Sequence, residues 1–171
     1  KARMATEANR PRAARAAVQI VAPEATGLVT DLNANPAKFL STKYLALRNV
    51  RKEIITLALI KLATSDTDAA IEQLKGKWAP QLTAEERNWI WGVIGKQAAN
   101  RLSDAAPSYF ANVTRDADLN DDLLGWKVRA ALRQGQWPAV LEATRGMSEE
   151  GRADPTWAYW RARALLAGNF A

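Results

Sequence analysis

Apolar residues recur at the spacing of an α-helix through almost the whole chain, and this regularity limits what it can fold into. Trp157, Trp160 and Ala164, for example, fall at i, i+3 and i+7, which is one stripe of a helix. Signals for strands are nearly absent, because the chain has no Asn-Gly pair and no sustained alternation of apolar and polar residues. The chain is therefore predicted to be all-α.

Prolines and capping residues indicate where the helices begin. Prolines suited to the first turn of a helix stand at Pro11, Pro23, Pro36, Pro107 and Pro155. Thr83 and Glu86 fit a capping box, in which each side chain bonds the backbone N–H of the other residue. Helices are predicted at 12–21, 24–33, 36–40, 47–64, 69–76, 84–102, 107–113, 118–134, 139–145 and 155–167, and a further one is expected to begin at 170–171 after a C-cap at 168–169.

The predicted helices recur at a regular interval. The long ones begin near 47, 83, 119 and 155, a lag of about 36 residues. A helix hairpin of this length buries its apolar stripe only against the next hairpin. We therefore expect a right-handed α-superhelix, a tetratricopeptide-like solenoid, as a single domain over 1–171 with the apolar helix at 47–64 at its centre. An irregular helical bundle is the alternative.

Composition excludes several functions. Cysteine and histidine are both absent, so thiol nucleophiles, Ser-His-Asp triads and zinc sites with N or S ligands are excluded, and we expect no cofactor and no metal. Much of the net charge of +6 lies in the first twenty residues, and the later arginines alternate with acids, so no nucleic-acid partner is expected. No apolar run approaches the roughly 18 residues that span a membrane.

Adjacent carboxylates are the remaining route to glycosidic catalysis, which needs an acid with a raised pKa. Such pairs occur at Glu85 and Glu86 and at Glu149 and Glu150. Each pair falls in or near the first turn of a predicted helix, where the helix dipole stabilises a negative charge. We therefore expect no catalytic residue in this chain.

The last third of the chain resembles a known family. The aromatic stretch 157–160 with Ala164, Leu165 and Gly168 is similar to a stretch in the superhelical domain of soluble lytic murein transglycosylases. Residues 126–132, followed by Gly135 and Trp137, resemble the hairpin that precedes it there. The resemblance covers 45–171 and extends loosely over the rest.

This resemblance implies a periplasmic location and a parent enzyme that cleaves the glycan strand of peptidoglycan between N-acetylmuramic acid and N-acetylglucosamine, forming 1,6-anhydromuramic acid. The catalytic residue of that family is a Glu followed by Ser in a lysozyme-like domain. No Glu of this chain is followed by Ser. We therefore expect a non-catalytic superhelical fragment, with the catalytic domain elsewhere in the parent protein and an apolar stripe left uncovered on the last helix.

Peptidoglycan is the partner that the resemblance implies. Arginines that could attract its anionic groups are Arg129, Arg133, Arg161 and Arg163. Trp89, Trp126, Trp157 and Trp160 fall on the inner stripes and are predicted to pack in the core, whereas Trp78 and Trp91 lie off that pattern and are the candidates for an exposed glycan contact. The rival interpretation is a tetratricopeptide-like adaptor that binds a partner peptide in its concave groove.

Overall fold

The computed structural model describes residues 1–41 and 51–169, and over these residues the chain is helical and contains no strand. The prediction of an all-α chain is confirmed. The chain divides into two compact units, Lys1–Ile90 and Trp91–Ala171, which are described in turn. The boundary falls within α7, which spans Ala84–Asn100.

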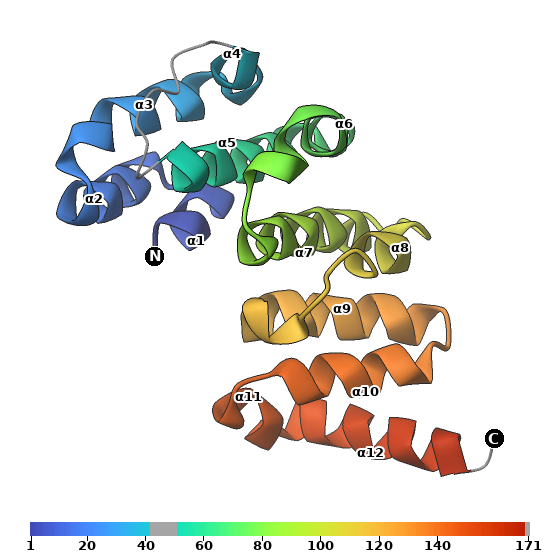
Figure 1. The fold of residues 1–171 in the computed structure, drawn as a ribbon. Helices are drawn as coiled ribbons and strands as arrows, with labels where there is room; N and C mark the ends of the chain where they lie inside the picture. Colours follow the sequence, from blue (N-terminus) through green and yellow to red (C-terminus); the bar gives the residue numbers. More distant parts are fainter. Residues whose placement is uncertain (42–50, 170–171) are drawn as a thin grey trace. The chain divides into compact units, whose positions relative to one another are not determined.

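Unit 1 is built around the apolar helix α5. Its helices are α1 (Ala2–Glu7), α2 (Pro11–Val21), α3 (Thr26–Ala34), α4 (Pro36–Ser41), α5 (Arg51–Ser65), α6 (Thr67–Gln73) and the first turns of α7, with short helical turns at Pro23–Ala25, Leu74–Trp78 and Ala79–Gln81. α5 packs against α1, α3, α4 and α6 (Figure 1). Its residues 54–60 are all buried. The prediction of a central helix packed on more than one side is therefore confirmed.

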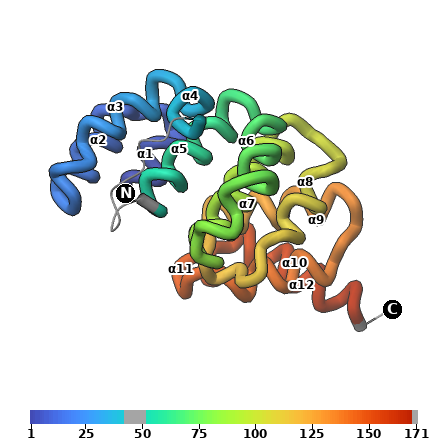
Figure 2. Tube along the Cα trace, turned by 45° about the horizontal axis from the view of Figure 1, so that its top comes forward, coloured from blue at the N-terminus to red at the C-terminus, as the bar shows by residue number. Residues whose placement is uncertain are grey.

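Unit 2 is a stack of antiparallel helices. After the rest of α7 it contains α8 (Ala106–Phe110), a 3-10 turn at Asp116–Asp118, α9 (Asp121–Arg133), α10 (Trp137–Gly146), α11 (Glu149–Ala153) and α12 (Pro155–Asn169). α9 packs against α10, and α10 against α12, so these helices form successive layers in Figures 1 and 2. α8 lies beside the C-terminal end of α9, and α11 lies toward its other end. α10 packs against both α9 and α12, and side chains of α9 and α12 also meet, as Arg129 and Trp157 do.

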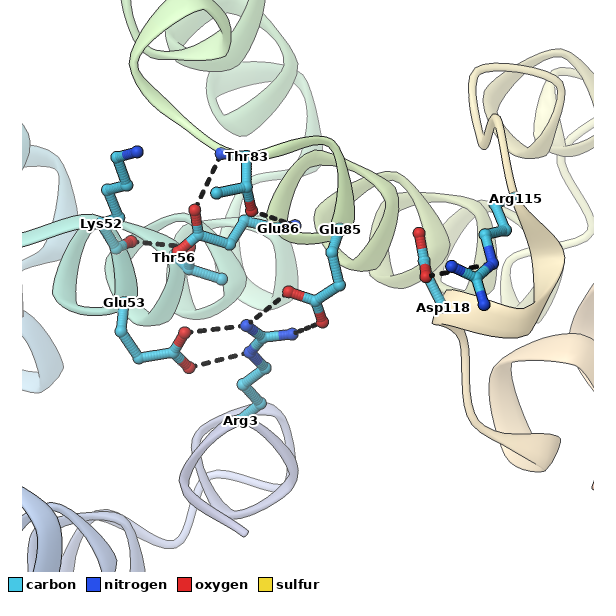
Figure 3. Close-up of polar contacts among 9 residues, drawn as sticks. All are labelled: Arg3, Lys52, Glu53, Thr56, Thr83, Glu85, Glu86, Arg115 and Asp118. Carbon is cyan, nitrogen blue, oxygen red and sulfur yellow. Dashed lines mark hydrogen bonds and ion pairs between the residues drawn. The ribbon is translucent and has the colours of Figure 1, made fainter.

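The predicted capping box forms at the start of α7. The backbone N–H of Thr83 donates to Glu86 Oε1 at 2.8 Å, and the backbone N–H of Glu86 donates to Thr83 Oγ1 at 3.2 Å (Figure 3). Other side-chain N-caps occur at Asp66, Asn120 and Ser148. These caps satisfy backbone N–H groups that lack a partner within the helix.

Several predicted boundaries are wrong. α8 ends at Phe110, so Val113 lies beyond it, and α1 and α11 are helices for which no bounds were predicted. The helical path continues past Gly76 as a π-helical turn, and α12 continues through Gly168 to Asn169. The predicted starts at 47–50 and 170–171 lie outside the described residues.

The apolar stripe of the last helix is covered only in part. Ala164 is buried against its neighbours, Trp157 and Trp160 are half-buried, and Leu165 and Leu166 are 44% and 53% exposed. Within the described residues, no helix is both long and apolar enough to cross a membrane.

Candidate functional site

Three side chains from two layers of unit 2 form what we call the Trp-Arg stack: Trp126 and Arg129 of α9 and Trp157 of α12. The guanidinium carbon of Arg129 lies 4.7 Å from the ring centre of Trp126 and 5.2 Å from that of Trp157. Each such contact is worth about 0.5–1 kcal/mol at an exposed site. Because Trp126 and Arg129 are about one helical turn apart, α9 alone sets one of these contacts.

A glycine allows the second tryptophan to reach the stack. A Cβ atom at Gly125 would lie 2.7 Å from Cζ2 of Trp157 and 3.0 Å from its Cη2. The indole is rigid, so relieving this close contact requires the whole ring to shift. Gly125 therefore provides the space that lets α12 bring Trp157 over α9.

A small pocket lies next to the stack, where α7 ends and α8 and α9 meet. Its volume is about 120 Å³. The residues that line it, here called the α7–α9 pocket, are Ala99, Leu102, Ser103, Ala106, Trp126, Arg129, Ala130, Arg133 and Gln134. Arginine and tryptophan side chains therefore share a concave site with small apolar groups.

The two arginines of the pocket keep much of their hydrogen-bonding capacity. Within the described residues, Arg129 has no hydrogen bond or ion pair, and its guanidinium lies against the two indole rings. Nε of Arg133 lies 3.7 Å from Oδ1 of Asp104, and both side chains are largely exposed. A guanidinium held by stacking presents its N–H donors at its edge, which suits a carboxylate or phosphate.

Leu102 has an unusual backbone conformation at the edge of this pocket. Its φ is +58°, in the left-handed region. Its N–H bonds the carbonyl of Ala99 and the N–H of Ser103 bonds that of Ala98, which is the Schellman arrangement that ends many helices and usually has glycine at this position. The side chain of Leu102 is 66% exposed. A bulky apolar residue is therefore held in a strained conformation at the pocket edge.

Not all four predicted arginines are brought together. Arg129 and Arg133 line one pocket, whereas Arg163 bonds Tyr159 on its own helix at 2.9 Å. Arg161 is exposed on α12 and does not line the pocket. Of the four predicted arginines, Arg129 and Arg133 are therefore the two that share a pocket.

The prediction that Trp78 and Trp91 are exposed is wrong. Trp78 is 1% exposed, because the helical path runs on past Gly76 and keeps it on the buried side with Leu74. Trp91 is 7% exposed and stacks against Tyr109 at 6.3 Å between ring centres. The four tryptophans predicted to lie in the core, Trp89, Trp126, Trp157 and Trp160, are each half-buried, so the structure bears out that prediction only in part.

The paired acids have structural roles. Glu86 is the buried partner in the capping box, and Glu85 bonds Arg3. Glu149 and Glu150 are exposed in the first turn of α11. These positions agree with the predicted placement in first turns, although Glu86 is buried rather than solvated.

Arg3 connects three helices of unit 1. It donates to both oxygens of Glu53 at 2.8 Å and to Glu85 at 2.5 and 3.1 Å (Figure 3). Burial lowers the pKa of Arg3, but the hydrogen bonds to Glu53 and Glu85 outweigh it and raise the pKa above its ordinary value. Next to these ion pairs is an apolar cavity of about 740 Å³, lined mainly by α1 and α2 with Ile54 and Trp89.

A buried ion pair joins α9 to the turn before it. Lys127 Nζ lies 2.6 Å from Oδ2 of Asp116, and both side chains are less than a tenth exposed. The other oxygen of Asp116 has no hydrogen-bond partner in the described part of the chain. Burial raises the pKa of Asp116, and the opposing effect of Lys127 does not cancel it.

Within the described residues, no group of three or more acidic side chains could hold a metal ion. No family model, curated protein or solved structure matches the chain. The geometry defines a helical protein with a small cationic and aromatic site in unit 2.

Proposed function

We propose that this chain is a non-catalytic scaffold region of a periplasmic soluble lytic murein transglycosylase, and that its hairpins continue as a right-handed α-superhelix. The parent enzyme cleaves the N-acetylmuramic acid to N-acetylglucosamine bond of peptidoglycan. The proposal is supported by the resemblance at 126–132 and 157–160 and by the contact between those two segments, where Arg129 lies over the ring of Trp157.

The observation that carries the proposal is the Trp-Arg stack. Arg129, which has no hydrogen bond or ion pair in the part of the chain that the structure describes, presents its donors beside two half-buried indole rings, Trp126 and Trp157. Peptidoglycan offers groups for both: carboxylates on its stem peptides for the guanidinium, and pyranose rings for the exposed indole surface. The scaffold would hold the polymer at this place while a separate domain cleaves it.

The test is sedimentation with insoluble purified peptidoglycan. The protein is expected to pellet with the polymer, and Arg129→Gln is expected to reduce the bound fraction at least fivefold. Arg152→Gln is the matched control, because Arg152 is an exposed arginine of unit 2 that does not line the pocket. Absence of binding, or equal losses for the two variants, would overturn the proposal.

The adaptor interpretation is the second candidate, and the apolar cavity of unit 1 favours it. That cavity is larger than the pocket of unit 2 and is lined by Met4, Val18, Ile20 and Val21 among others. Ile20 and Val21 are each 84% exposed, so an apolar peptide could reach them. Substituting Ile20→Asp would abolish binding to a partner under this interpretation and leave peptidoglycan sedimentation unchanged under the first.

A further inference from the structure

The cationic side of the α7–α9 pocket favours an anion. Arg129 and Arg133 both line it, and none of its lining residues in the described part of the chain is acidic. Arg129 has no ion pair in the described part of the chain, and the carboxylate nearest Arg133 is 3.7 Å away on the exposed Asp104. Two guanidinium groups around one small space are suited to a carboxylate held by paired N–H donors.

The size and the remaining walls of the pocket limit what carries the charge. The volume of about 120 Å³ is small for a ligand site, since pockets that bind drug-sized molecules usually measure about 300–1,000 Å³. A carboxylate with a small aliphatic group attached to it is the kind of ligand that suits this space. Ala99, Ala106 and Ala130 line the pocket and would contact the aliphatic group.

The conformation of Leu102 supports a role in binding. A residue at φ +58° in a Schellman turn is normally glycine, because a left-handed backbone destabilises a residue with a Cβ atom. Here the side chain is 66% exposed, so burial compensates for little of that strain. Strain of this kind persists at ligand sites, where the side chain contributes once the ligand is bound.

We propose that the α7–α9 pocket binds the terminal carboxylate of an alanine-like residue, as carried by the stem peptides of peptidoglycan. Arg129, fixed by its two indole rings, and Arg133 hold the carboxylate. Leu102 closes over the methyl group of the ligand. The proposed function supplies the choice of stem peptide as the source of this carboxylate.

The test uses N-acetylalanine as the probe and the protein's backbone amide NMR signals as the readout. We expect saturable shifts confined to residues around 99–106 and 126–134, with a dissociation constant on the order of a millimolar because the ligand is small. N-acetylalaninamide, which lacks the charge, should bind at least tenfold more weakly. Inorganic phosphate should also bind more weakly, since it has no aliphatic group for the alanine wall.

Variants separate binding from folding. Arg129→Gln should lower the affinity for N-acetylalanine at least tenfold, whereas Arg152→Gln should change that affinity less than twofold. Leu102→Gly should raise the melting temperature, because glycine relieves the backbone strain. The same substitution should nevertheless lower the affinity for N-acetylalanine severalfold. A variant that is more stable and binds less cannot be explained by misfolding.

Equal affinity for the acid and the amide, tighter binding of phosphate, or equal losses in Arg129→Gln and Arg152→Gln would overturn the proposal. Soluble muropeptides should compete with N-acetylalanine, and muropeptides with amidated stem carboxylates should not. If N-acetylalanine binds but muropeptides do not compete, the stem peptide is the wrong source and a protein C-terminus takes its place. If peptidoglycan pellets the protein but N-acetylalanine does not bind, this inference fails while the proposed function stands.

Discussion

At the scale of single residues, the pair of Lys127 and Asp116 is where charge most affects stability. Both side chains are less than a tenth exposed, and Oε2 of Glu142 approaches the same ammonium group at 3.5 Å. Removing one partner of a buried pair leaves an uncompensated charge, which destabilises more than the pair itself stabilises. Replacing Lys127 should therefore lower the free energy of unfolding.

We expect Lys127→Met to lower the free energy of unfolding by about 3 kcal/mol at neutral pH. The loss should be smaller near pH 4. The pKa of Asp116 in the folded protein lies above its ordinary value. The stability that this group contributes is therefore present at a pH below the pKa it has in the unfolded chain. That stability is lost as the pH rises through the pKa of the folded state. Without Lys127 that pKa rises further. Urea denaturation at both pH values measures the difference.

Two controls accompany that measurement. The double variant Lys127→Met with Asp116→Asn should recover most of the lost stability, because it leaves no buried charge from the pair. Arg115→Gln removes an ion pair in which the exposed Arg115 lies 3.8 Å from Asp118 (Figure 3), and it should change stability by less than about 0.5 kcal/mol. A Lys127→Met deficit that is constant with pH would show that Asp116 does not titrate as described.

At the scale of elements, the contact between α9 and α12 depends on Gly125. A methyl group there would stabilise an isolated helix by about 0.5–1 kcal/mol relative to glycine, but a Cβ atom would lie 2.7 Å from the Trp157 ring. Overpacking of this kind typically costs about 1–3 kcal/mol. The clash therefore outweighs the gain in helix propensity.

Gly125→Ala is expected to destabilise the protein by about 1 kcal/mol and to weaken binding at the Trp-Arg stack. Gly27→Ala is the matched control, since Gly27 lies in α3 with no atom within 4 Å of an added Cβ, and it should be neutral or slightly stabilising. Thermal unfolding of both variants checks the prediction. A stabilised Gly125→Ala variant would mean that the ring of Trp157 moves freely.

The sequence predicted most helix starts, because prolines and caps are local signals. Pro11, Pro36 and Pro155 begin helices, and the capping box at Thr83 forms as expected. The predicted exposure of Trp78 failed, because whether a helix continues past Gly76 depends on what its far side packs against.

The candidate site was predicted only in part for the same reason. Arg129 and Arg133 were identified from charge alone. The approach of Trp157 to Arg129 depends on the contact of two layers, which periodicity does not give. Leu102 has no sequence signature, since the left-handed position of a Schellman turn is identified by glycine, and leucine gives the opposite signal.

At the scale of the whole molecule, the two candidate functions place ligands in different units. The peptidoglycan proposal places binding in unit 2, at the Trp-Arg stack and the α7–α9 pocket. The adaptor interpretation places it in unit 1, in the cavity beside α1 and α2. Because each site lies within one unit, a map of where ligand protects the backbone separates the two accounts.

Hydrogen exchange of the protein with and without soluble muropeptides is the most direct test of the central claim. We expect protection at the end of α7, in the second half of α9 and at the start of α12, with little change in α1 and α2. The same map for Arg129→Gln should lose that protection. Protection confined to α1 and α2, or none at any saturating muropeptide concentration, would contradict a peptidoglycan-binding scaffold.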